Sequence, residues 1–188
     1  MSVWIAVGII AVAAAAIVIL YNRLVKTRQM AEEGWSGIDV QLKRRANLIP
    51  NLIETVKGYA THERGVLEEV TELRAQVGKV AEGDVADRSR LEGMLSGAIG
   101  RLLAIAENYP DLKANQNFLK LQTALQTIED EIQMSRRYYN GAVRNLNVMV
   151  ESFPSNLIAQ NFGFQKREYF EIDDAADRAL PQVSFDGK

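Results

Sequence analysis

The chain opens with 22 residues that carry no charged side chain, and the first charge is that of Arg23. Almost every residue between positions 3 and 20 is apolar. A helix over residues 2–21 would be about 30 Å long, which matches the hydrocarbon core of a bilayer. The pattern predicts a membrane-spanning helix, and its assigned residues are Val3, Trp4, Ile9, Ile10, Ala14, Ile17, Leu20 and Tyr21. Trp4 and Tyr21 stand near the two ends, where aromatic rings favour the membrane interface.

Two other interpretations of this segment fit less well. A cleaved signal peptide has a basic region before a short apolar core, whereas the only positive group before Arg23 is the N-terminal amine. A buried helix of a soluble core needs a shorter apolar run. Arg23, Lys26 and Arg28 follow the segment and nothing basic precedes it. The positive-inside rule therefore places the N-terminus outside and the body in the cytoplasm, with a single pass.

The remainder of the chain has a helical spacing of apolar residues. Positions three or four apart are apolar from Trp35 to Val80, with an interruption expected near Pro50 and Gly58. We expect the first helix to continue directly from the span. A shorter helix is expected over residues 91–105, and a heptad-like one, typical of coiled coils, over residues 118–153. The predicted fold is all-α: an N-terminal transmembrane helix followed by an elongated antiparallel bundle of long amphipathic helices.

Turn signals divide these helices. One turn is expected at residues 82–87 and another at residues 108–111, where Asp111 is expected to cap the next helix. The last long helix should end before Pro154. The predicted segments are a transmembrane helix at 1–22, a bundle at 23–160 and a C-terminal tail at 161–188 that is first aromatic and then acidic. The two long helical stretches exceed the short one between them, and this surplus favours self-association.

Polar residues interrupt the apolar stripes at Arg45 and Glu63, and Arg137 follows a stripe position on the facing helix. These side chains could lie at the rim of the bundle, where long side chains reach water. They could instead form an interhelical network between arginine and carboxylate groups that fixes the helix register. We favour the network for Arg45 and Glu63, because each interrupts an otherwise apolar stripe.

Four of the chain's aromatic residues gather after Pro154, within nine positions. They are Phe162, Phe164, Tyr169 and Phe170. They could cover the core of the bundle, or they could form a surface for assembly or for docking a partner. The sequence leaves both interpretations open.

Catalytic and metal-binding patterns are missing from the sequence. His62 is the single histidine, and His62-Glu63 lacks the second histidine of a zinc-protease helix. The chain has no cysteine, which excludes a disulfide framework and a thiolate site. It also lacks a nucleophile elbow and a phosphate-binding loop. We predict no enzyme activity, cofactor or metal, and a hydrolase using His62 and Glu63 is the remaining catalytic alternative. The net charge of −2 argues against nucleic acid as a partner.

Several runs in order along the chain closely resemble the LemA family signature. They are RRANLIPNLI at 44–53, VKGYA at 56–60 followed by His62-Glu63, ENYPDLKA at 107–114, RYYN at 137–140, NLN at 145–147 and FPS at 153–155. Asn47 departs from the pattern, because the family often has Asp there. The resemblance implies a bacterial protein with one N-terminal span and an elongated antiparallel helical body. It implies no established activity or cofactor. Some relatives are linked to membrane shaping, and related genes often neighbour those of membrane proteases.

These observations predict a non-catalytic scaffold that is anchored in the bacterial inner (cytoplasmic) membrane, self-assembles there and organises or shapes it. The expected partners are the lipid bilayer and further copies of the chain. The alternative is an adaptor that binds a membrane protease or a signalling partner through the C-terminal aromatic residues.

Overall fold

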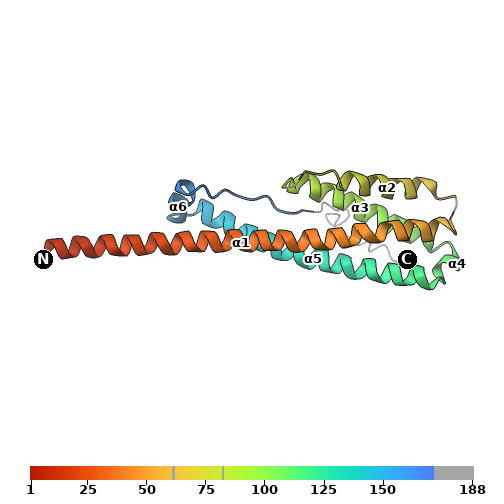
Figure 1. Cartoon of the computed structure of the whole chain (residues 1–188), viewed down its shortest axis with the longest axis horizontal. Helices are drawn as coiled ribbons and strands as arrows, with labels where there is room; N and C mark the ends of the chain where they lie inside the picture. The colour runs from red at the N-terminus through yellow and green to blue at the C-terminus, as the bar shows by residue number, and fades with distance from the viewer. Residues whose placement is uncertain (61, 82, 172–188) are drawn as a thin grey trace, which may run out of the picture. The chain divides into compact units, whose positions relative to one another are not determined.

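A computed structural model gives the structure of residues 1–60, 62–81 and 83–171 (Figure 1). Its helices are α1 (Ser2–Lys57), α2 (Arg64–Val77), α3 (Val85–Ala106), α4 (Pro110–Lys113), α5 (Gln116–Glu151) and α6 (Ser155–Asn161). No strand occurs among these described residues. The all-α prediction is confirmed. The chain forms two compact units, and the first comprises residues 1–47 and 123–170. The described part of the second comprises residues 48–60, 62–81 and 83–122 together with Glu171.

Helix α1 begins in the apolar segment and runs without a break past Trp35, as the sequence predicts. It contains Pro50 and continues to Lys57. The chain then leaves the helical conformation at Gly58 and resumes it at Arg64, so the predicted interruption falls at Gly58 rather than at Pro50. A proline in a helix interior removes a hydrogen bond but is tolerated where packing holds the helix. Ile49 and Leu52, on either side of Pro50, are fully buried.

The first unit is built on the N-terminal part of α1 and most of α5, which pack closely. A side chain placed on Gly34 of α1 would lie 2.9 Å from the backbone Cα of Tyr139 on α5, so the two helices come together at this point. The ring of Trp35 lies 5.6 Å from that of Tyr139 and 5.8 Å from that of Phe170. Fully buried apolar side chains from both helices fill the contact, among them Ile38, Leu42, Ile132 and Leu146.

The second unit contains the end of α1, the α2–α3 pair, α4 and the beginning of α5. Asp84 caps α3 by accepting a hydrogen bond of 3.0 Å from the backbone N–H of Asp87. The prediction that Asp111 caps the last long helix is wrong, because Asp111 lies inside α4. Asn115 does this instead, since its side-chain oxygen accepts from the backbone N–H groups of Asn117 and Phe118 at 2.8 and 3.2 Å.

The aromatic part of the predicted tail packs on the first unit. Residues 164–171 form neither helix nor strand and run as an extended stretch after α6 (Figure 1), and Phe164 and Phe170 are buried. The chain is therefore still part of the first unit at Phe170, ten residues beyond the predicted boundary at 160. The acidic end of the tail, including Asp173-Asp174, lies outside the described residues.

Candidate membrane-anchoring site

The apolar segment at the beginning of α1 has no protein packed against it. Figure 1 shows this end of α1, drawn in red, extending past α6. None of the residues in the most apolar 18-residue window of the helix is buried. Trp4 is 80% exposed and Ile10 68% exposed. Val3, Ile9, Ala14 and Ile17 are exposed as well. The structure thus presents a helix that is long and apolar enough to cross a membrane.

Packing begins where the predicted span ends. Leu24 is the first buried residue of α1, and it forms a core cluster with Leu146, Ala159 and Phe164. Leu20 is partly exposed. The ring of Tyr21 lies 4.9 Å from that of Phe162 and 5.8 Å from that of Phe164. The change from bare helix to packed helix therefore falls at residues 20–24, where the sequence places the membrane boundary.

A belt of basic side chains lies at this boundary and just after it. Arg23, Lys26 and Arg28 are all exposed on α1. The guanidinium group of Arg28 lies 5.2 Å from the centre of the Phe164 ring, a cation–π contact. Glu32 is 4.0 Å from Arg28 and accepts a hydrogen bond of 2.7 Å from Arg167. Part of the basic belt is thus held in place by the body of the first unit.

Arg45 is almost fully buried, with 1% of its side chain exposed. It donates a hydrogen bond of 2.9 Å to the carboxylate of Glu129 on α5. The neighbouring Arg44 lies 3.5 Å from Glu131 at the surface. The structure therefore places Arg45 in an interhelical pair of the kind the sequence suggests. A role of this pair in fixing register stays a prediction.

Glu63 and Arg137 occupy other environments. Glu63 precedes α2, outside any helix, and accepts a hydrogen bond of 3.1 Å from the hydroxyl of Tyr109. Partial burial and the Glu63 carboxylate together raise the pKa of Tyr109. The partner of Glu63 is thus a tyrosine rather than the expected arginine. Arg137 is exposed, and no carboxylate pairs with it in the described part of the chain.

The four C-terminal aromatic residues divide into two pairs. Phe164 and Phe170 are buried at 7% and 0% exposure, which agrees with the core-covering interpretation and leaves them outside any open docking surface. Phe162 and Tyr169 are exposed. Phe164 and Phe170 thus cover the core at two separate points of the segment, and the residues between them are mostly exposed, namely Gln165, Lys166, Glu168 and Tyr169.

Two asparagines of α5, Asn147 and Asn140, hold the extended segment and are called the clamp below. Sequence reasoning missed them. Asn147 donates to the carbonyl of Arg167 and accepts from its N–H group, both at 2.9 Å. Asn140 makes the same pair of bonds with Phe170, at 3.1 and 2.9 Å. Seven helical residues and three extended residues both span about 10 Å, which explains the matched spacing. The hydroxyl of Tyr139 donates to the carbonyl of Glu168 at 2.9 Å, and burial is the main cause of its raised pKa.

An arginine-lined groove lies beside this segment on the first unit. It has a volume of about 390 Å³ and is lined by Arg136, Arg137, Asn140, Gly141, Arg144 and Tyr169. No carboxylate belongs to the lining. Such a groove suits an anionic group, because guanidinium groups bind carboxylates and phosphates with paired hydrogen bonds.

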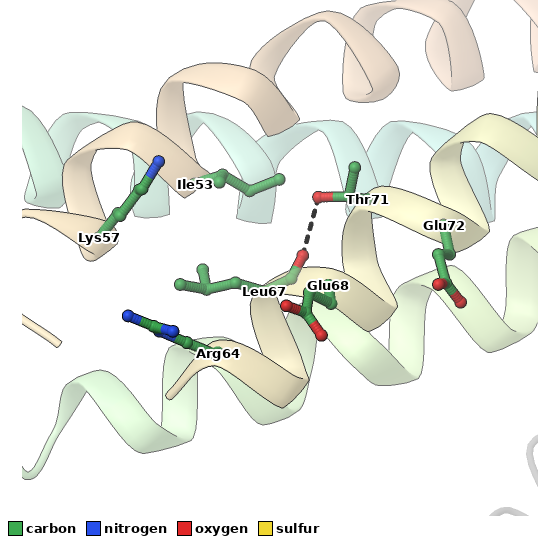
Figure 2. Close-up of a pocket in the computed structure, with 7 residues that line it drawn as sticks. All are labelled: Ile53, Lys57, Arg64, Leu67, Glu68, Thr71 and Glu72. Carbon is green, nitrogen blue, oxygen red and sulfur yellow. Dashed lines mark hydrogen bonds between the residues drawn. The ribbon is translucent and has the colours of Figure 1, made fainter. Parts of the chain in front are cut away.

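A larger pocket, of about 600 Å³, lies in the second unit between the end of α1 and α2 (Figure 2). Lys57, Arg64, Glu68 and Glu72 supply charges, but the hydroxyl of Thr71 donates to the carbonyl of Leu67 in its own helix. His62 is exposed and does not line it. Within the described ranges, no three histidine or acidic residues are placed to hold a metal ion. The pocket therefore brings together no recognisable nucleophile, general base and orienting group.

The bare apolar helix, the basic belt and the helical body define a helical protein with one membrane-compatible N-terminal helix. The chain belongs to the LemA family, whose model matches residues 34–185, so the resemblance seen in the sequence is confirmed. It is similar to magnetosome protein MamQ 2 of Paramagnetospirillum magneticum, with 26% identity over 90% of this chain and 72% of the relative. MamQ of Magnetospirillum gryphiswaldense is 26% identical over 87% of this chain and 70% of the relative. Protein LemA of Metamycoplasma hominis is 26% identical over 81% of this chain and 69% of the relative.

Proposed function

We propose that the chain is a non-catalytic helical protein anchored in the bacterial inner membrane by a single pass of α1. The exposed apolar segment carries this proposal. Ten large apolar side chains between Val3 and Ile19 are exposed. Full burial of one such side chain contributes about 1.5–3 kcal/mol. These ten are 45–80% exposed, so leaving the set in water costs on the order of 10–20 kcal/mol. This exceeds or matches the net stability of a typical domain, about 5–15 kcal/mol. A bilayer removes that penalty.

The proposed orientation has the N-terminus outside and the body in the cytoplasm. It is supported by Arg23, Lys26 and Arg28, which lie just after the span. Because the chain has no cysteine, single-cysteine variants label without background. In intact cells, a membrane-impermeant maleimide should label Ser2→Cys, whereas Met134→Cys should react only after the membrane is permeabilised. The reverse pattern would overturn the orientation, and extraction of the chain by alkaline carbonate would overturn the anchoring.

Catalysis is not part of the proposal. His62 is exposed, and the carboxylate of Glu63 is engaged by Tyr109. The names of the relatives, magnetosome protein MamQ and protein LemA, refer to no reaction. A His62→Ala strain should keep the wild-type phenotype, and loss of function in that strain would revive the hydrolase alternative.

We further propose that the anchored chains self-assemble and organise the membrane around them. The surplus helix length supports this, as does the presence of MamQ proteins, named for the magnetosome, among the relatives. The mass of the assembly extracted in a mild detergent tests the proposal. Several copies per particle are expected, and a single chain per micelle across a wide concentration range would refute self-assembly.

The arginine-lined groove favours a second candidate function, that of an adaptor for an acidic segment of another membrane protein. Arg136, Arg137 and Arg144 provide three positive charges there, and the exposed ring of Tyr169 adjoins them. A membrane protease or signalling protein with an acidic tail would fit this chemistry. Co-purification of such a partner should be lost in Arg137→Glu/Arg144→Glu and kept in Lys43→Glu, which changes an exposed lysine of α1. Retention of the partner in the double variant would remove this site.

A further inference from the structure

Helix α6 lies at the membrane end of the first unit, beside the point where α1 becomes bare. Figure 1 shows α6 beyond the end of α5, on the side of the N-terminal part of α1. The ring of Phe162, directly after α6, lies 4.9 Å from that of Tyr21. Since Tyr21 is the last residue of the predicted span, Phe162 stands at the same depth as the end of the span.

The segment around α6 has the composition of a membrane-contacting element. Residues 152–165 contain no charged side chain, and only the N-terminal apolar segment has a longer charge-free run. Phe153 is 79% exposed, Leu157 50% and Phe162 57%. Burying side chains of this size is worth about 1.5–3 kcal/mol each. Three large apolar groups at the end of a soluble body therefore require an explanation.

The opposite face of the same segment is fixed to the first unit. Ser155 and Ala159 are buried, and Phe164 packs with Leu24 and Leu146. The segment is thus held in one orientation, with its apolar side chains directed away from the core that anchors it. Charges resume directly beyond it, where Lys166 pairs with Glu151 at 2.6 Å.

We propose that Phe153, Leu157 and Phe162 form an interfacial foot that enters the headgroup and upper acyl region of the leaflet next to the body. The proposal rests on the membrane anchoring by α1. Lipid is the occupant because the foot is continuous with the span through Tyr21, and any group covering it must lie at the depth of the headgroups. Large apolar side chains beside polar ones, here Asn156, Gln160 and Asn161, are typical of elements that lie in the interface plane.

The foot has a mechanical consequence for the anchored chain. With α1 alone, the body could tilt about a single helix. A second contact, held to the body through Phe164 and Ala159, fixes the orientation of the first unit relative to the bilayer. The foot also adds apolar volume to one leaflet only, which makes binding sensitive to membrane curvature.

Site-directed spin labelling of the full-length chain in phosphatidylethanolamine/phosphatidylglycerol vesicles tests the foot. Labels are attached to single cysteines at Leu157 and Phe162, at Ile10 within the span, and at Met134. Met134 is a matched control, since it is an apolar side chain of the first unit with 55% exposure. It lies about 25 Å along α5 from the end of that helix at Glu151. The measured quantity is the ratio of collision with oxygen, which enters lipid, to collision with a water-soluble nickel chelate.

The expected ratio is highest at Ile10, several-fold above the Met134 value at Leu157 and Phe162, and lowest at Met134. A high ratio at Ile10 with Met134-like values at Leu157 and Phe162 would overturn the foot and leave the anchor intact. An aqueous value at Ile10 would instead refute the anchoring on which the foot rests. Labels at Phe162 that exclude both reagents, with spin–spin broadening relieved by dilution with unlabelled chain, would assign the surface to a second copy and also overturn the foot. Helical circular dichroism equal to that of the parent chain checks the fold of every variant.

Discussion

Substitution of Gly34 by alanine tests the closest approach between α1 and α5. The added Cβ would lie 2.9 Å from Tyr139 Cα, 3.1 Å from a ring carbon of Tyr138 and 3.2 Å from Tyr139 Cβ. The nearest of these atoms belongs to the backbone, so no side-chain rotation can make room. The two helices must separate locally, and the loss extends to the ring contact of Trp35 with Tyr139.

The size of the effect follows from two opposing contributions. Alanine in place of glycine stabilises a helix interior by about 1 kcal/mol. Overpacking of a close contact destabilises by about 1–3 kcal/mol, and the backbone obstacle places Gly34 in the upper half of that range. We expect Gly34→Ala to lower the free energy of unfolding by about 1–2 kcal/mol. For a chain of this length, that corresponds to a melting temperature lower by about 2–8 °C.

The same helix provides the control. A Cβ on Gly37 would meet only the Ser135 hydroxyl, at 3.8 Å, which is an ordinary contact. Gly37→Ala should therefore raise the free energy of unfolding by about 0.5–1 kcal/mol. Thermal unfolding of both variants in the same detergent, followed by far-UV circular dichroism, gives the comparison. If Gly34→Ala proved as stable as Gly37→Ala, the tight approach of the two backbones would be refuted.

Three further predictions concern the first unit. Glu129→Gln removes the ion pair between that carboxylate and the buried guanidinium of Arg45. It should lower the free energy of unfolding by about 1–3 kcal/mol, less than for a fully buried pair, because water still reaches part of this one. The surface change Glu131→Gln should alter the free energy of unfolding by less than about 0.5 kcal/mol in the same denaturant titration. Asn147→Leu removes both hydrogen bonds to Arg167, so hydrogen exchange at that amide should accelerate while α2 and α3 keep their protection, and unchanged exchange would contradict the clamp. Burial is the main reason that the pKa of Tyr139 is raised above its ordinary value of 10.0. The contribution of the neutral Tyr139 hydroxyl to stability is therefore fully present below pH 10.0 and is lost as the pH rises through the folded-state pKa. Between pH values of about 9 and 11, the melting temperature of Tyr139→Phe should fall less than that of the parent chain.

The sequence was sufficient for features that depend on periodicity and composition. The three-to-four spacing identified the helices, and the missing charges before Arg23 identified the bare segment of α1. The interruption was expected from Pro50 or Gly58, and the structure places it at Gly58. Glycine weakens a helix because it loses more conformational freedom on folding than any other residue, whereas Pro50 lies near the fully buried Ile49 and Leu52 and is held by packing.

Other features depend on which side of a segment faces the core. Asp111 and Asn115 are both suitable capping residues, and the choice between them depends on the short helix α4 that precedes α5. The aromatic tail has no helical period, and nothing in the order of its residues separates the buried Phe164 and Phe170 from the exposed Tyr169. The clamp has a signal too, because asparagines seven positions apart on a heptad-like helix share one face. The role of Asn140 and Asn147 can be recognised only once the structure shows that an extended segment lies beside them.

The arrangement of the first unit connects the anchor with the body in a specific way. Helix α1 passes from the bare segment into the contact with α5 without a break, and Gly34 lies 13 residues beyond Tyr21. At about 1.5 Å per residue, the closest helix approach is about 20 Å from the end of the predicted span. The clamped segment runs along the same stretch, because Phe170 contacts Trp35 and Phe164 contacts Tyr21. Three segments of the chain therefore stiffen the region next to the proposed span, so under the proposed anchoring a force applied to the body is transmitted to the span rather than absorbed by a hinge.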